Sequence, residues 1–185
     1  FAQGAMVLFA ALAMARFSEW IPKWLGMAPG FVTIALALMV SVIIMIGVAW
    51  LIERLALRHL VNQEPITLLM ATLGIAYLLD GLGPMIFGSA VYSINVGMPK
   101  EPVFILEGLF DGGVLVSKED LYSAIIAAVL VAALTLFFQK TKTGRALRAV
   151  ADDHQAAQSI GIPLGRMWVI VWSVAGVVAL VVGII

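Results

Sequence analysis

The stretch Phe31–Ile52 carries no charged side chain. An α-helix rises about 1.5 Å per residue, so about 20 apolar residues are enough to cross the hydrocarbon core of a bilayer. Further apolar runs occupy residues 1–15, 65–89, 121–138 and 167–185. None of them alternates apolar and polar residues strictly, as the strands of a membrane barrel would. The pattern predicts an all-α polytopic integral membrane protein built as a bundle of transmembrane helices.

The composition supports a membrane location. Hydrophobic residues make up 63% of the 185 residues, charged residues make up 12%, and the mean hydropathy is +1.08. Soluble domains are usually about 45–50% apolar and about 25% charged. The apolar runs at 1–15 and 167–185 indicate partial spans. We therefore expect residues 1–185 to form a single transmembrane domain that is truncated at both ends.

The sequence offers no residues for covalent chemistry. The chain has no cysteine, which excludes disulfides, thiol catalysis and thiolate metal sites. Its two histidines, His59 and His154, are far apart and lack metal-ligand spacing. The sequence also lacks a phosphate-binding Gly-x-x-x-x-Gly-Lys-Ser/Thr motif and a Gly-x-Ser-x-Gly motif. We expect no catalytic residue, no metal, no cofactor and no nucleic-acid partner.

Two polar segments are predicted to share one side of the membrane. Residues 16–30 read as a surface link, because Trp20 and Trp24 favour the membrane–water interface. Residues 92–120 are acidic and contain two short β-prone runs, Val103–Leu106 and Val114–Val116, which predict a small hairpin.

The remaining polar segments, 53–63 and 139–166, are predicted on the opposite side. They hold more arginine and lysine than the segments at 16–30 and 92–120. The positive-inside rule therefore places 53–63 and 139–166 in the cytoplasm and leaves the predicted hairpin outside.

The segment 139–166 is polar, basic and helical in pattern. Thr143 is in place to cap a helix from Gly144, and Gly161 stands where a left-handed C-cap is expected. One face of this helix is polar and comprises Arg145, Arg148, Asp152, Gln155 and Ser159. The other face is apolar and comprises Leu147, Val150, Ala151, Ala157 and Ile160. Taken alone, the pattern fits a helix resting on the bilayer as well as one built for a partner.

Several motifs, in order along the chain, resemble one family. The string Thr143-Gly144-Arg145-Ala146-Leu147-Arg148-Ala149, with Ala157 and Gly161-Ile162 after it, resembles the permease subunits of branched-chain amino acid ABC importers and their urea and amide relatives. Gln155-Ala156-Ala157, three residues and Gly161 are similar to the Glu-Ala-Ala–three–Gly core of importer loops, with Gln155 in the acidic position. Phe1-Ala2-Gln3-Gly4, Thr72-Leu73-Gly74 and Phe87-Gly88 also match, so the resemblance covers essentially the whole chain.

The resemblance implies a function in which ATP is hydrolysed elsewhere. A coupling helix at Gly144–Ile160 would seat in a groove of a cytoplasmic ABC ATPase subunit. The residues implied in this coupling are Arg145, Arg148, Gln155, Ala156, Ala157 and Gly161. Further implied partners are a homologous second permease, a periplasmic substrate-binding protein and membrane lipid. The chain would be a transport subunit, not an enzyme, that moves branched-chain or other hydrophobic amino acids or small amides across the bacterial plasma (inner) membrane.

Polar side chains within the apolar runs are candidates for the substrate path: Gln3, Thr67, Thr72, Tyr77 and Asp80. A carboxylate at membrane depth costs about 2.5–3.5 kcal/mol on insertion scales, so it usually faces a cavity or a partner. Alternatively, Gly81, Gly83 and Pro84 end the helix and leave Asp80 solvated near the outer interface. Threonine and tyrosine also commonly pack between transmembrane helices.

The alternative function is an ion-coupled secondary transporter of small solutes. Such a protein would need polar residues near the membrane midplane to bind the coupling ion. Apart from Asp80, the apolar runs carry no charge. An intramembrane enzyme would need paired catalytic groups at one depth, and the runs lack such pairs.

Overall fold

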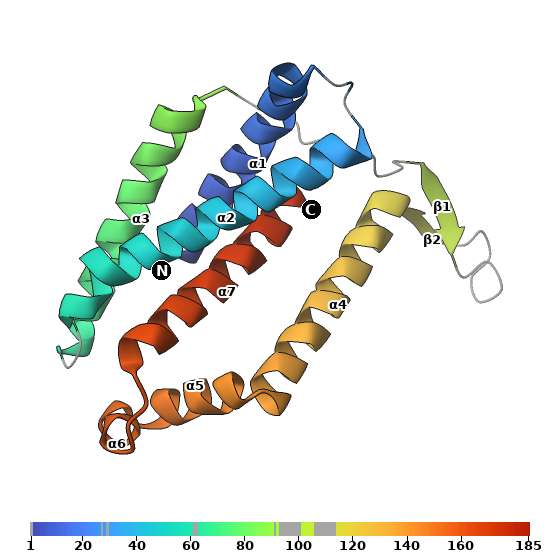
Figure 1. The fold of residues 1–185 in the computed structure, drawn as a ribbon. Coiled ribbons are helices and arrows are strands. Elements are labelled where there is room, and N and C mark those ends of the chain that lie inside the picture. The colour runs from blue at the N-terminus through green and yellow to red at the C-terminus, as the bar shows by residue number, and fades with distance from the viewer. Residues whose placement is uncertain are drawn as a thin grey trace. The chain divides into compact units, whose positions relative to one another are not determined.

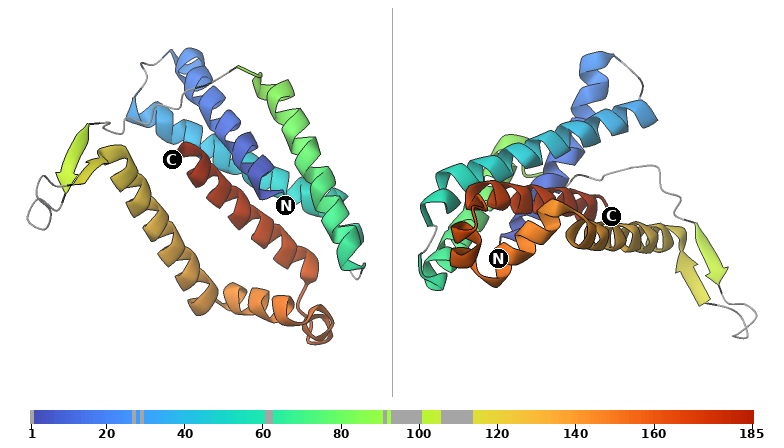
Figure 2. Two further views of the ribbon diagram at one scale, coloured as in Figure 1. Left: turned by 180° about the vertical axis from the view of Figure 1, so that it is seen from behind. Right: turned by 60° about the horizontal axis from the view of Figure 1, so that its bottom comes forward.

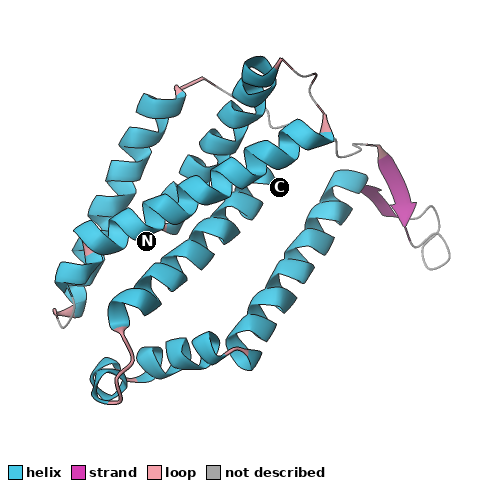
Figure 3. Cartoon of the chain, viewed as in Figure 1, coloured by secondary structure: helices cyan, strands magenta, loops and turns pink. Residues whose placement is uncertain are grey.

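The structure is a computed structural model of residues 1–185, and it describes residues 2–26, 28, 30–60, 63–90, 92, 101–105 and 114–185. Nearly all of the described chain is helical (Figures 1 and 3). The elements in order are α1 (Gln3–Leu25), α2 (Phe31–Leu55), the short 3-10 helix η1 (Leu57–Leu60), α3 (Pro65–Phe87), β1 (Pro102–Ile105), β2 (Val114–Ser117), α4 (Lys118–Lys140), α5 (Lys142–Asp152), α6 (His154–Ser159) and α7 (Leu164–Ile184).

Within the described residues, five helices are long and apolar enough to cross a membrane, namely α1, α2 with its extension η1, α3, α4 and α7. This confirms the prediction of an all-α polytopic membrane protein. The chain divides into two compact units, residues 1–94 with 149–185 and residues 95–148. Each unit is described by itself.

In the second unit, the predicted hairpin is present. Strands β1 and β2 are antiparallel, with Val103 opposite Val116 and Pro102 opposite Ser117. The Lys118 ammonium lies 3.1 Å from the Glu101 carboxylate and closes the open end of the pair. Leu106, which was expected to end the first strand, lies outside the described residues.

In the first unit, α1 is the central helix. It packs against α2, α3 and α7, and α2 also packs along α7 (Figures 1 and 2). The buried side of α2 repeats every fourth residue through Ala37, Ser41, Met45 and Ala49. The Ser41 hydroxyl contacts the Met14 sulfur of α1 at 3.9 Å. Small or slender side chains at these positions let helix backbones approach closely, which is how helices associate in lipid.

Helices α1 and α7 run in the same direction at very short range. The Gln3 side-chain amide donates to the Ala175 carbonyl oxygen at 3.3 Å. Further along both helices, a Cβ at Gly183 would lie 3.0 Å from the Ala11 Cβ and 3.1 Å from the Val7 carbonyl oxygen. The Gln3 end of α1 is therefore level with the middle of α7.

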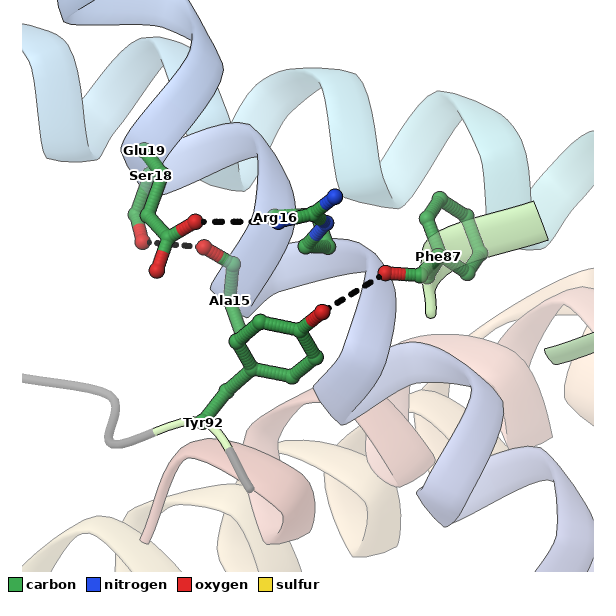
Figure 4. A network of polar contacts seen from close by, with 6 residues as sticks. All are labelled: Ala15, Arg16, Ser18, Glu19, Phe87 and Tyr92. Carbon is green, nitrogen blue, oxygen red and sulfur yellow. Dashed lines mark hydrogen bonds and ion pairs between the residues drawn. The ribbon is translucent and has the colours of Figure 1, made fainter. Parts of the chain in front are cut away.

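Helix α1 continues beyond the predicted span, so the expectation that residues 16–30 form a surface link was wrong for residues 16–25. The cause is local neutralisation of charge (Figure 4). Arg16 pairs with Glu19 at 3.2 Å one turn ahead, and its guanidinium lies 4.9 Å from the Trp20 ring and 5.0 Å from the Tyr92 ring. Because the guanidinium is paired and stacked in this way, the helix can continue past Arg16.

Tyr92 joins this network to the end of α3. Its hydroxyl donates to the Phe87 carbonyl oxygen at 3.0 Å (Figure 4). Gly88 has a φ of 90°, and a Cβ there would lie 2.7 Å from the Tyr92 hydroxyl oxygen. Glycine is required at position 88 both for its backbone conformation and for this contact.

Gly183→Ala should destabilise the first unit, because the added methyl meets the backbone and Cβ of α1. We expect a loss of about 1–3 kcal/mol, as overpacking of a tight core usually costs. Gly47→Ala is the matched control, since a Cβ at Gly47 has nothing within 4 Å. The measurement is the thermal midpoint of the purified protein in detergent. Equal midpoints for the two variants would contradict the close contact between α1 and α7.

Candidate functional site

The predicted coupling segment is two helices, so the expectation of one continuous helix over Gly144–Ile160 was wrong. Helix α5 ends at Asp152 and α6 begins at His154. The Asp153 carboxylate accepts a hydrogen bond from the Ala156 backbone N–H at 3.0 Å. An aspartate in this position satisfies a free N–H at the start of a helix, so it begins a new one.

The N-cap of α5 is Thr141, and the prediction of Thr143 was wrong. The Thr141 hydroxyl accepts from the Gly144 N–H at 2.9 Å and donates to the Phe137 carbonyl oxygen at 2.6 Å. One side chain thus closes the last turn of α4 and opens the first turn of α5. The two helices consequently meet at a sharp corner.

Gly144 sits inside this corner. A Cβ at position 144 would collide with the Phe137 carbonyl oxygen and would lie 2.6 Å from the Phe138 carbonyl oxygen. These neighbours are backbone atoms, which cannot move aside as a flexible side chain would. Only glycine allows α5 to leave α4 at this angle.

Helix α5 is amphipathic, as predicted, but Ala151, which was expected on its apolar face, is exposed. Gly144, Leu147 and Val150 are buried at three-residue spacing, while Arg145 and Arg148 are exposed. The Arg148 guanidinium reaches the Phe138 carbonyl oxygen at 3.5 Å, a long contact that leaves most of its donors available. The exposed arginines form a basic surface on α5.

Helix α6 ends in a Schellman motif. The Ile162 N–H donates to the Ala157 carbonyl oxygen at 3.1 Å, and the Gly161 N–H donates to the Gln158 carbonyl oxygen at 3.0 Å. Gly161 has a φ of 84°, which confirms the predicted left-handed C-cap. Ala157 is buried and Ala156 is exposed, but Ile160, expected on the apolar face, is 73% exposed. The break at Asp153 resets the helical phase, which explains that error.

The predicted coupling residues fall into two groups. Arg145 and Arg148 belong to the second unit, whereas Ala156, Ala157 and Gly161 belong to the first. Gln155 lies in α6, and its side chain is outside the described residues. Sequence reasoning missed Thr141 and Asp153. A hydroxyl or carboxylate three residues before a free N–H is the signal that identifies both as caps.

Helix α3 runs through Gly81–Pro84 without interruption and ends at Phe87. The expectation that this stretch ends the helix was wrong, because Gly83 serves close packing. A Cβ at Gly83 would lie 3.3 Å from Leu12 and 3.5 Å from Phe9 of α1. Asp80 therefore lies about two turns before the end of α3, since an α-helix has about 3.6 residues per turn.

The other candidates for the substrate path do not gather at one point. Tyr77 and Asp80 are exposed and three residues apart, so they share a face of α3. The Thr72 hydroxyl donates to the Leu69 carbonyl oxygen of its own helix at 2.8 Å, and Thr67 is exposed on a different side. Gln3 is exposed too, and its amide is held by α7.

The fold defines a multi-pass membrane protein with a basic helical segment between α4 and α7. A family model described as "Branched-chain amino acid transport system / permease component" matches residues 1–185. The chain belongs to this family and is a multi-pass protein of the inner membrane. No solved structure matches the chain.

Curated relatives agree with the family. The chain is 26% identical to the high-affinity branched-chain amino acid transport system permease protein LivH of Escherichia coli K12 and to that of Salmonella typhimurium, over 98% of this chain and 56% of each relative. It is 22% identical to the permease protein BraD of Pseudomonas aeruginosa, over 98% of this chain and 64% of that protein. The chain thus spans little more than half the length of the LivH proteins.

Gly144→Ala should open the corner between α4 and α5, because its methyl collides with the α4 backbone. We expect faster proteolytic cleavage within residues 139–153 and a severe loss of transport. Gly81→Ala is the control, since a Cβ there has nothing within 4 Å. Limited proteolysis of membranes, followed by mass spectrometry, makes the comparison. Unchanged cleavage in Gly144→Ala would refute the assignment of this corner.

Proposed function

We propose that this chain is part of the permease subunit of an ATP-binding-cassette importer. Its cargo would be branched-chain or other hydrophobic amino acids or small amides. Family membership supports transport and disfavours the alternative of an ion-coupled secondary transporter. The relatives' names, which specify branched-chain amino acid transport, support the substrate class.

The observation that carries the proposal is the α5–α6 segment. Between α4 and α7 the chain builds two capped helices. Arg145 and Arg148 expose guanidinium groups that suit acidic side chains on a partner. The small side chain of Ala156 is exposed and allows a partner's backbone to come close.

The proposed partner at this segment is a cytoplasmic ABC ATPase subunit. Closure of two ATPases on ATP would push on α5 and α6 and switch the pore between outward- and inward-facing states. A homologous second permease would complete the pore, and a periplasmic substrate-binding protein would deliver the cargo. Membrane lipid surrounds the apolar faces. This chain would perform no covalent chemistry itself.

Asp80 and Tyr77 are the residues that we propose for the path. A carboxylate on an exposed face of a membrane helix is unfavourable against lipid, so a pore or a partner is its expected neighbour. At the pore, the carboxylate would attract the ammonium group of an amino acid, and the tyrosine hydroxyl would hydrogen-bond it.

Ala156→Arg should abolish association with the ATPase, because a long cation would replace a methyl at the contact. The fold should survive, since Ala156 is exposed. Gln63→Arg is the matched control, because it adds the same charge on the same predicted side but outside α5 and α6. Co-purification of the ATPase with full-length permease from detergent is the measurement. Equal recovery with both variants would refute the proposed docking surface.

Asp80→Asn should raise the KM for amino-acid uptake about tenfold or more, since it removes the charge facing the ammonium group. Asp120→Asn makes the same chemical change at the exposed start of α4 and should leave uptake unchanged. Radiolabelled uptake into cells provides both KM values. If Asp80→Asn transports normally, Asp80 is not on the path.

A further inference from the structure

A cleft of about 530 Å³ lies within the first unit, where the end of α2 and η1 meet α6 and the start of α7. Glu53, Arg58, Gln158, Gly165, Arg166 and Trp168 are among the residues that line it. Small-molecule sites usually measure about 300–1,000 Å³, so this cleft has a suitable size. None of these residues belongs to the coupling set or the substrate path.

Glu53 is the feature of this cleft that needs explanation. The residue is only 8% exposed, yet its carboxylate forms no hydrogen bond or ion pair with any part of the chain that the structure describes. A buried carboxylate is costly unless it has a partner. Glu53 has no such partner among the described residues, and its oxygens are not fully enclosed, so a ligand in the cleft can reach them.

The start of α7 is shaped around this carboxylate. A Cβ at Gly165 would lie 2.9 Å from Glu53 Oε1, so the glycine leaves room for the group. Gly165 is in the first turn of α7, and the positive end of a helix dipole favours a negative charge at that place. The carboxylate is thus held at the wall of the cleft with one side open to it.

The rest of the cleft has the opposite charge and an apolar wall. Arg58 and Arg166 are exposed, and neither forms an ion pair with another described residue. Leu57, Trp168 and Val169 supply apolar surface. The cleft therefore combines one buried anion, two exposed cations and a hydrophobic wall.

We propose that this cleft binds a free, zwitterionic amino acid with an apolar side chain. The ligand's ammonium group would donate to Glu53, its carboxylate would accept from Arg58 and Arg166, and its side chain would lie against Trp168. An organic anion would pair with the arginines but leave Glu53 without a partner. A cation, including a basic side chain of a partner protein, would pair with Glu53 but leave the arginines without one. A dipolar ligand pairs with both charges.

The location gives this binding a consequence. This inference rests on the proposed function, which places α5 and α6 on the cytoplasmic side of the membrane. The cleft would then face the cytoplasm. Gln158 of α6 and Arg166 of α7 both line the cleft, so a ligand would tie the proposed ATPase-docking helix to the bundle. Amino acid accumulated in the cytoplasm would then restrain α6 and slow further import.

The test is binding to purified full-length permease, with L-leucine as the probe. Isothermal titration should give leucine an affinity at least tenfold higher than that of leucinol, which lacks the carboxylate, or of 4-methylpentanoate, which lacks the ammonium group. Glu53→Gln and Arg166→Gln should each weaken leucine binding about tenfold or more. Arg54→Gln is the matched control, because Arg54 stacks on Trp50 and does not line the cleft.

Gly165→Ala provides a second variant should Glu53→Gln fail to fold, because its methyl displaces the carboxylate. It should weaken leucine binding without removing a charge. Leucine binding that survives both variants, or equal binding of leucinol, would overturn the proposal. Tighter binding of leucinol than of leucine would instead identify a site for a basic partner and would also overturn it.

Uptake separates this inference from the proposed function. In proteoliposomes holding the whole importer, leucine on the ATPase side should slow uptake by the wild type but not by Glu53→Gln. Normal uptake that ATPase-side leucine never slows would overturn the regulatory role and leave the proposed function intact. Absent uptake by the wild type, with leucine binding that depends on Glu53, would overturn the proposed function and support the cleft.

Discussion

The close approach of α1 to α7 and α2 is the constraint on which the first unit depends. In lipid, apolar side chains gain little free energy by exchanging contacts with lipid tails for contacts with one another. Helices therefore associate through close packing and polar contacts. Gly183 brings α7 to within van der Waals contact of the α1 backbone, and Gly176 does the same against Met45 of α2. The Gln3 amide adds one directional bond between α1 and α7. The register of these three helices fixes where their own polar side chains lie.

Three charged side chains of the first unit have three different environments. The charge of Arg16 is paired within the chain, with Glu19 and the rings of Trp20 and Tyr92, although its buried Nε has no hydrogen-bond partner among the described residues. Asp80 is exposed on α3 and requires water, substrate or another subunit beside it. Glu53 is buried at a cleft with its partner missing from the described chain. The first charge has an ion-pair partner within the fold, whereas Asp80 and Glu53 have none among the described residues.

The membrane-spanning helices were predictable from hydropathy and length alone. In lipid every backbone polar group must be paired, so an apolar segment of this length forms a helix. The extension of α1 was not, since recognising it requires knowing that Tyr92 returns to cover Arg16. The break at Asp153 was missed because the residues around it keep a helical pattern, although an aspartate can cap the backbone N–H three residues later, as Asp153 does for Ala156. The left-handed C-cap at Gly161 was predictable, because a glycine followed closely by a proline marks a helix end from local sequence alone. The cleft at Glu53 joins segments more than a hundred residues apart, and no local pattern encodes such a meeting.

The most direct test of the account is the energy source for transport. The complete importer, reconstituted into proteoliposomes with its binding protein, should take up leucine only when ATP can be hydrolysed on the side of α5 and α6. Collapse of ion gradients by ionophores should leave that uptake unchanged. Uptake that proceeds without ATP and stops when an ion gradient is dissipated would contradict the account and establish a secondary transporter.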